Sequence, residues 1–187
     1  MEDHVLIEQF RDPQSRQFAF NQLIHKYQER VYWHIRKMVI DHDDTNDLTQ
    51  DVFVKIYQNL ETFRADAQLF TWIYRIATNE CLGFLRKKKN RTMVTWDDAE
   101  NELQHALANS LAPDGDEIQL KLQQAILTLP EKQRLVFNMK YFDELKYEDI
   151  SSILDTSVGA LKASYHHAVK KIEAFINQDA VLLTSNG

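Results

Sequence analysis

The residues best suited to chemistry lie between positions 72 and 91, and the chemistry they could do is binding. On a helix one face is shared by residues spaced three, four and seven apart, namely Trp72, Arg75, Asn79 and Arg86. This face runs into the segment 86–91, Arg-Lys-Lys-Lys-Asn-Arg, which holds five positive charges in six residues. Single-stranded nucleic acid is bound by such a combination, because bases stack on aromatic rings while cations follow the backbone.

This face also has a purely structural interpretation. Trp72 could belong to the core, and the basic segment could be a solvated helix end, where cations interact favourably with the helix dipole. A second nucleic-acid-binding pattern in the same chain would favour the binding interpretation.

Such a pattern lies near the C-terminus, where residues 147–171 predict a helix-turn-helix. A short amphipathic helix is followed by the break Asp155-Thr-Ser157, and Ser157 suits the N-cap of a longer helix. The buried face of that helix is predicted to carry Leu161, Tyr165, Ala168, Ile172 and Ile176. Its outer face is predicted to carry Gly159, Ala160, Lys162, Ser164, His166 and Lys170. Small residues allow close approach to a DNA groove, and lysines can contact phosphates. However, three short helices with a Gly-containing turn also occur in purely structural bundles.

Other candidate sites are poor. His166 and His167 are adjacent, so they point about 100° apart on a helix and do not form a metal pair. Cys81 falls on the apolar face of its predicted helix, where packing is a better explanation than nucleophilic chemistry. Because the chain also lacks a Gly-rich phosphate loop, we expect no enzyme activity, no cofactor and no metal.

Composition predicts an all-α protein. The 187 residues include only 4 Gly and 3 Pro, 44% are hydrophobic, and strand-like alternation is nearly absent. A single cysteine indicates a reducing compartment. The chain has neither an apolar run of about 20 residues nor the basic start of a signal peptide, so we expect a cytoplasmic location.

The acidity of the chain is concentrated in one segment. Its net charge is −6, and residues 92–120 carry seven acids and no base. We therefore predict a helical domain over 1–91, a flexible acidic linker over 92–116, a four-helix domain over 117–177 and a fraying tail over 178–187. The first domain should hold a long helix through Phe20 and Ile35, a second starting near Asp44 or Thr45, and a third over about 69–89.

Two blocks of sequence resemble one known family. The first is Asp47-Leu-Thr-Gln-Asp-Val-Phe-Val-Lys-Ile-Tyr57 together with Phe70-Thr-Trp-Ile-Tyr-Arg-Ile-Ala-Thr-Asn-Glu-Cys-Leu-Gly-Phe-Leu-Arg86. The second begins with Leu127-Thr-Leu-Pro-Glu-Lys-Gln-Arg-Leu-Val-Phe137 and continues into the helix-turn-helix. In their order and spacing these blocks are similar to bacterial RNA polymerase sigma factors of the extracytoplasmic-function (ECF) group, over roughly residues 5–176.

The resemblance implies a transcription initiation factor whose partners are core RNA polymerase, promoter DNA and an anti-sigma factor. The resemblance is also compatible with a membrane-bound anti-sigma factor. Docking on the polymerase clamp is implied for Asp47, Leu48, Gln50, Asp51, Phe53 and Lys55. Recognition and melting of the minus-ten element is implied for Trp72, Arg75, Thr78, Asn79, Arg86, Lys87, Lys88, Lys89 and Arg91. Recognition of the minus-thirty-five element is implied for Arg134, Ser157, Val158, Gly159, Ala160, Lys162, Ser164, His166 and Lys170.

Four positions depart from the family pattern. The family often has an acid where Gly83 stands, a Thr at Ala160, and Arg at Ser164 and His167. Since guanine recognition usually favours Arg, the upstream preference should depend more on apolar contacts and DNA shape.

Three other classes of function make different predictions. A conventional helix-turn-helix regulator would dimerise, bind duplex DNA without polymerase and sense a ligand or phosphoryl group through residues 1–91. A protein-interaction adaptor would bind neither duplex nor melted DNA. An enzyme would need a catalytic constellation, and no such pattern is found in the sequence.

Overall fold

The computed structural model describes residues 2–91 and 117–184, and within these ranges it contains helices and no strands, which confirms the predicted all-α class. The chain divides into two compact units, Met1–Lys88 and Lys89–Gly187. The predicted acidic linker, residues 92–116, lies outside the described residues. No helix in the described part of the chain has both the length and the apolar character that crossing a membrane requires.

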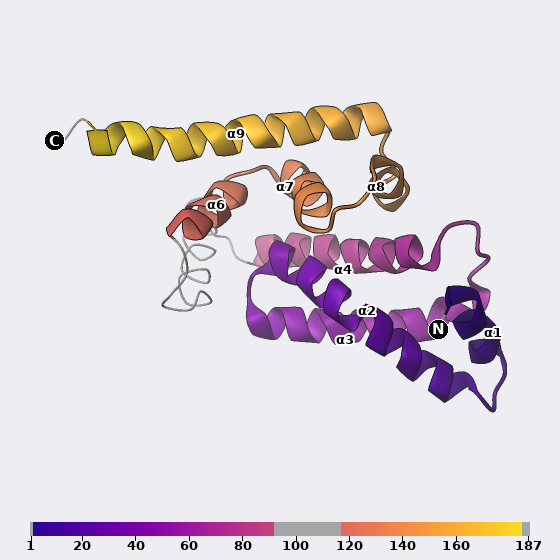
Figure 1. The fold of residues 1–187 in the computed structure, drawn as a ribbon. Helices are drawn as coiled ribbons and strands as arrows, with labels where there is room; N and C mark the ends of the chain where they lie inside the picture. Colours follow the sequence, from indigo (N-terminus) through magenta and orange to yellow (C-terminus); the bar gives the residue numbers. More distant parts are fainter. Residues whose placement is uncertain (1, 92–116, 185–187) are drawn as a thin grey trace. The chain divides into compact units, whose positions relative to one another are not determined.

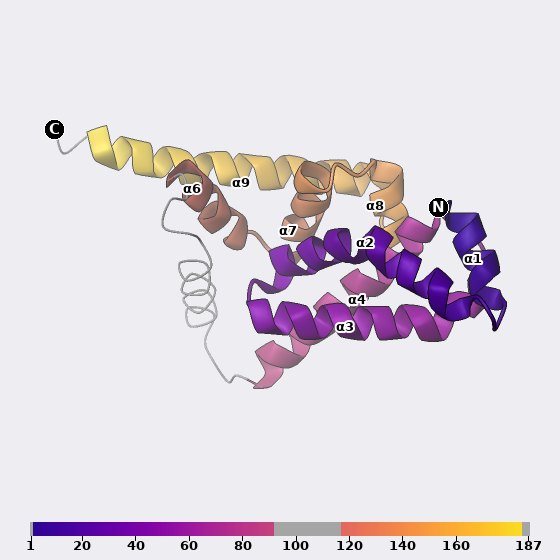
Figure 2. The same ribbon diagram turned by 60° about the horizontal axis from the view of Figure 1, so that its bottom comes forward.

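The first unit is a bundle of three long helices with a short helix at one end (Figures 1 and 2). Its elements are α1 (Asp3–Arg11), α2 (Arg16–Val39), α3 (His42–Asn59), the 3-10 turn η1 (Leu60–Thr62) and α4 (Leu69–Arg91). The predicted stripe of α2 is buried at Phe20, Leu23, Tyr27, Val31 and Ile35, and that of α3 at Leu48, Val52, Ile56 and Leu60. These apolar rows hold the bundle together, because each removes a continuous face from water.

The break between α2 and α3 is shorter than predicted. The helix was predicted to start near Asp44 or Thr45, whereas α3 already begins at His42. Asp41 is the N-cap, and its Oδ1 accepts a hydrogen bond from the Asp44 backbone N–H at 2.8 Å. This bond satisfies an amide that the first helical turn leaves free, so the helix starts before the apolar periodicity does.

Helix α4 has the two faces that its sequence predicts. Ile73, Ala77 and Cys81 are fully buried, while Phe70 and Phe84 at the ends of the same row are only half-buried. The opposite face is exposed at Arg75, Asn79 and Arg86 and half-buried at Trp72. The Trp72 ring is therefore partly packed, as the structural interpretation expects, and partly open, as binding to a base would require.

The thiol of Cys81 should be unreactive in the folded protein. Burial, followed by the nearby charge of Glu80, raises the pKa of Cys81 to about 12. From a starting value of 9.0, the thiolate fraction at pH 8 should fall about 10³-fold. We expect an aromatic disulfide reagent to label native protein at least about 100-fold more slowly than urea-unfolded protein. Equal labelling rates in the two states would contradict the buried position.

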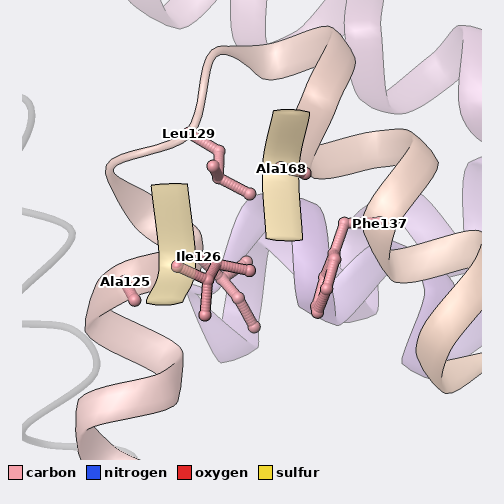
Figure 3. Packing of buried hydrophobic residues seen from close by; sticks show 6 residues of the cluster. Ala125, Ile126, Leu129, Phe137 and Ala168 are labelled. Atoms are coloured by element: carbon pink, nitrogen blue, oxygen red, sulfur yellow. The ribbon is translucent and has the colours of Figure 1, made fainter. Parts of the chain in front are cut away.

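The second unit consists of three short helical segments packed along one long helix. Its elements are α6 (Glu117–Leu127), α7 (Glu131–Phe137) with a π-helical continuation η2 (Asn138–Phe142), α8 (Tyr147–Leu154) and α9 (Val158–Thr184). The first three lie on the same side of α9 (Figure 1). Their core contains Ile126 from α6, Phe137 from α7 and Ala168 from α9, with Leu129 between them (Figure 3).

The long helix α9 continues beyond Asn177, where the sequence pattern predicts that it frays. It ends at Thr184. No Gly or Pro stands between Ala160 and Asn186, so nothing in the sequence interrupts the backbone hydrogen bonding.

Candidate nucleic-acid interface

A cavity of about 520 Å³ opens beside the predicted binding face of α4. One wall comes from α4, and the other comes from the end of α3 and the segment after it. Its lining is Lys55, Asn59, Thr62, Phe63, Arg64, Asp66, Ala67, Trp72, Arg75, Ile76, Asn79 and Glu80. The cavity lining therefore includes three of the predicted minus-ten residues, Trp72, Arg75 and Asn79. The opposing wall was not predicted, because segment 59–67 has no periodic pattern.

An aromatic pair stands among the residues that line this cavity. The rings of Phe63 and Trp72 lie 5.2 Å apart between centroids and are tilted by 47°. Phe63 is buried, so its ring packs against the half-buried indole and supports it. The Trp72 ring is thus held at the cavity while part of its surface stays open, as stacking on a base requires.

The polar lining carries cations and amides. Lys55 donates a charge-assisted hydrogen bond to the carboxylate of Glu80 at the rim. Arg64 and Arg75 add two further cations, and Asp66 adds one acid. Within the described residues, no hydrogen bond engages the side-chain amide of Asn79, so its donor and acceptor are available to a ligand. Cations with an open amide suit a base joined to phosphates.

Thr78 does not lie with the other residues of its predicted group. It is 1% exposed, and its Oγ1 lies 2.9 Å from Nε2 of His34, which is itself 1% exposed. In this conformation Thr78 is therefore not accessible for direct contact with DNA. The bond instead joins α2 to α4 beside the cavity. His34 was missed by the sequence reading, although its place three residues after Val31 puts it on the buried row of α2.

The basic end of α4 is partly engaged within the unit. Lys88 pairs with Asp44 at 3.2 Å, and the Arg86 Nε donates to the Leu82 carbonyl at 3.1 Å. Lys87 and Lys89 are exposed, whereas the side chain of Arg91 lies outside the described residues. Both pairings are exposed and therefore weak, so these cations could exchange them for phosphates.

The six residues predicted to dock on polymerase separate into two groups. Asp47, Gln50, Asp51 and Lys55 are exposed along one face of α3. In contrast, Leu48 is 6% exposed and Phe53 is 8% exposed, so both belong to the core of the unit. The same outer face carries Val54 and Tyr57, exposed by 53% and 39%, which were not predicted although they follow Gln50 at helical spacing.

The predicted recognition helix is the first part of α9. Ser157 is its N-cap, and Ser157 Oγ accepts a bond from the Ala160 backbone N–H at 3.3 Å. Exposed side chains are found at Ala160, Lys162, His166 and Lys170, while Val158 and Ser164 are half-buried. At the exposed Gly159 an added Cβ would meet nothing within 4 Å, so the surface is open there. This end of α9 can approach another molecule closely.

Arg134 lies inside the second unit. The residue is 8% exposed, and within the described part of the chain its buried Nε has no hydrogen-bond partner. Desolvation lowers the pKa of Arg134 from its ordinary value, and the charge of Glu131 partly opposes this. A buried guanidinium without a full set of partners lowers the stability of the folded unit. The packing of the unit therefore does not by itself explain a charged residue at this position.

Comparison with known proteins matches both units. The family described as Sigma-70 region 2 matches residues 23–91, and Sigma-70, region 4 matches residues 119–172. The RNA polymerase sigma-H factor of Pseudomonas aeruginosa is 33% identical over 92% of each chain. The ECF RNA polymerase sigma factor SigW of Bacillus subtilis is 32% identical over 80% of this chain and 84% of its own. The ECF RNA polymerase sigma-E factor of Escherichia coli is 32% identical over 91% and 92%.

Two solved structures share the fold. The sigma factor RpoE from Bartonella quintana, in complex with the anti-sigma factor NepR, has a TM-score of 0.66 at 18% identity. That match covers 84% of this chain and 96% of RpoE. CnrH in complex with the cytosolic domain of CnrY has a TM-score of 0.69 at 21% identity, covering 95% and 98%.

Proposed function

Because this chain belongs to the ECF group of bacterial RNA polymerase sigma factors, we propose that the cavity and α9 recognise the promoter while α3 binds the polymerase. The protein is a transcription initiation factor that binds core RNA polymerase, recognises promoter DNA at two elements and promotes strand opening. The assignment of individual residues to these steps is the subject of the proposal.

The cavity beside α4 receives a base of the minus-ten element once the strands separate. Extruding a base costs a few kcal/mol of pairing and stacking, so a prepared site must offset this cost. Trp72 supplies the stacking surface, Asn79 the open amide, and Arg75 a positive charge near the backbone. The meeting of these three residues at one cavity is the single observation that carries the proposal. Thr78 and His34 act from inside, by holding α4 against α2.

The outer face of α3 docks on the polymerase clamp. Asp47, Gln50, Asp51 and Lys55 present the polar contacts, and the exposed Val54 adds an apolar one. Leu48 and Phe53 contribute indirectly, because they anchor α3 in the bundle.

The first turns of α9 enter the major groove at the minus-thirty-five element. Gly159 and Ala160 permit the approach, and Lys162 and Lys170 are placed to meet phosphates. Each of the two DNA-binding sites of the protein has only modest affinity by itself. Joined in one chain on polymerase, they gain affinity through effective concentration, so the free protein should bind promoters weakly.

The protein supplies recognition and strand opening, while the polymerase performs RNA synthesis. Its place of action is then the cytoplasm, where polymerase and chromosome are found in bacteria. We also propose control by an anti-sigma factor, since the sigma factor RpoE, which shares the fold, was solved in complex with the anti-sigma factor NepR.

Transcription from purified components tests this function. The protein is added to bacterial core polymerase with a library of promoter fragments, and transcripts are sequenced. A defined set of promoters with two separated elements is expected. A protein that never supports initiation and never co-purifies with core polymerase would be an adaptor or a conventional regulator instead.

Reversing one charge on α3 tests the docking surface. Asp51→Lys should weaken binding to core polymerase about 10- to 100-fold, because a like charge then faces the partner surface. Binding is measured by fluorescence anisotropy of the labelled protein. Glu29→Lys is the matched control, since Glu29 is an exposed acid on α2 away from this face. Equal affinities of the two variants would contradict the assignment.

A further inference from the structure

The short helix α1 lies outside the span matched by the Sigma-70 region 2 family, yet its C-terminal end touches the wall of the cavity. We infer that α1 braces this wall, so that Arg11 and Arg16 are positioning residues for recognition of the extruded base. The inference rests on the proposed base-binding role of the cavity.

Two arginines, Arg11 at the end of α1 and Arg16 at the start of α2, join the end of α1 to Phe63 and to η1. The Arg11 Nη2 donates a hydrogen bond to the backbone carbonyl of Phe63 at 3.1 Å. The Arg16 Nη2 lies 3.2 Å from the Glu61 carboxylate, and the Arg16 Nε donates to the Phe10 carbonyl at 3.0 Å. The Arg16 guanidinium also stacks over the ring of Phe10, 5.1 Å from its centroid. Together these contacts hold η1 and Phe63 against the end of α1.

The wall needs such support because it has little regular structure of its own. Between η1 and α4, residues 63–68 form no helix, and Ala65 has a left-handed backbone with φ of 59°. A residue with a Cβ is strained in this region, so the conformation depends on the contacts around it. Phe63 stands at the start of this segment, and its ring is the support of Trp72. A shift of the Phe63 backbone would therefore move the wall and the stacking surface together.

The brace can be loosened without detaching α1. At its other end, both Asp3 carboxylate oxygens accept from the Tyr27 hydroxyl at 2.8 Å, and Lys26 donates to the same carboxylate at 2.8 Å. Leu6, Ile7 and Phe10 of α1 are buried in the unit. Arg11 is exposed and Arg16 pairs with an exposed Glu61, so neither pairing is a main source of stability.

The test measures recognition of one base by the holoenzyme. Labelled single strands carry the non-template minus-ten segment of a promoter found with the library, and each base in turn is replaced by an abasic site. With wild-type protein, the position that enters the cavity should lose about tenfold in affinity when abasic. With Arg11→Met, the intact strand should bind about fivefold more weakly, while the abasic strand is nearly unaffected. The abasic penalty at that position should thus shrink to about twofold.

Two further variants separate the brace from general stability. Lys26→Met removes a cation that anchors the other end of α1, and it should keep the full abasic penalty. Arg11→Lys retains an N–H donor for the Phe63 carbonyl and should restore part of the penalty. Glu61→Gln weakens the pairing between Arg16 and Glu61, so the abasic penalty should shrink as it does with Arg11→Met. This result should hold even where either variant lowers the melting temperature.

The outcomes distinguish the two levels of the proposal. An equal loss of affinity for intact and abasic strands, or an unchanged penalty in Arg11→Met, overturns the brace and leaves the base-binding cavity intact. Absence of a penalty at every position in the wild type overturns the proposed role of the cavity itself.

Discussion

Replacing Trp72 with alanine should lower the rate of promoter opening about 10- to 100-fold and change the affinity for core polymerase less than about twofold. A base stacked on an aromatic ring gains about 1–3 kcal/mol, and this gain is available only after the strands separate. The docking face of α3 presents other residues, so polymerase binding should be spared. Promoter opening is monitored with a fluorescent base analogue in the minus-ten segment, and the affinity for polymerase is measured by fluorescence anisotropy.

Three companion variants make this prediction specific. Trp72→Phe keeps an aromatic surface and should retain more opening than Trp72→Ala. Trp33→Ala removes an exposed tryptophan of α2 and should leave opening unchanged. Asn79→Ala should impair opening like Trp72→Ala, because it removes the open amide from the same cavity. If Trp72→Ala reduced polymerase binding and opening to the same extent, the division of roles would be wrong.

Phe53 is not a suitable probe of the docking face. The family resemblance places it among the polymerase contacts, but its ring is buried in the bundle. Phe53→Ala should cost about 3–5 kcal/mol of unfolding free energy, so any loss of binding would reflect damage to the fold. The exposed Asp51 reports on docking more directly.

Replacing Arg134 with methionine should weaken upstream recognition without weakening the second unit. A buried charge that lacks partners carries a desolvation cost, and replacing it by an apolar residue of similar length is often neutral or stabilising by about 1–4 kcal/mol. We therefore expect the unfolding free energy of this unit to stay equal or rise. If Arg134 reaches a phosphate in the complex, as the family resemblance implies, the affinity of the holoenzyme for duplex carrying the minus-thirty-five element should fall about tenfold.

Lys162→Met is the control for this experiment. Its side chain is exposed on α9, so its loss should lower DNA affinity with little change in stability. Stability is measured by urea unfolding of the full chain, and affinity by competition with labelled duplex. A large loss of stability in Arg134→Met would identify Arg134 as a structural residue, and the minus-thirty-five role that the resemblance implies for it would be withdrawn.

The helices and their buried rows follow directly from local sequence. Leu48, Val52, Ile56 and Leu60 recur at four-residue steps and are all buried, because a helix places such residues on one side whatever it packs against. The helix-turn-helix is readable for the same reason, since the Ser157 cap and the row from Leu161 to Ile172 depend only on near neighbours in the chain.

Spacing alone did not reveal which residues of the candidate site are accessible. Thr78 and Phe53 were predicted in the same groups as exposed residues such as Asn79 and Asp51, yet His34 of α2 meets Thr78 and the bundle core encloses Phe53. Arg134 has a charged side chain and is nevertheless buried. For Thr78 the neighbour that covers the side chain comes from another element, so no local pattern reports it.

The aromatic and basic face of one helix predicted Trp72, Arg75 and Asn79 as a group, and it indicated nucleic acid only together with the helix-turn-helix. The cavity that brings them together requires a second wall from residues 59–67, which have no periodic signal, and a helix at the N-terminus that holds this wall. Periodicity records how one helix divides into faces. The shape of a binding site depends on contacts between segments about 50 residues apart, such as Arg11 and Phe63, and only the packed chain creates them.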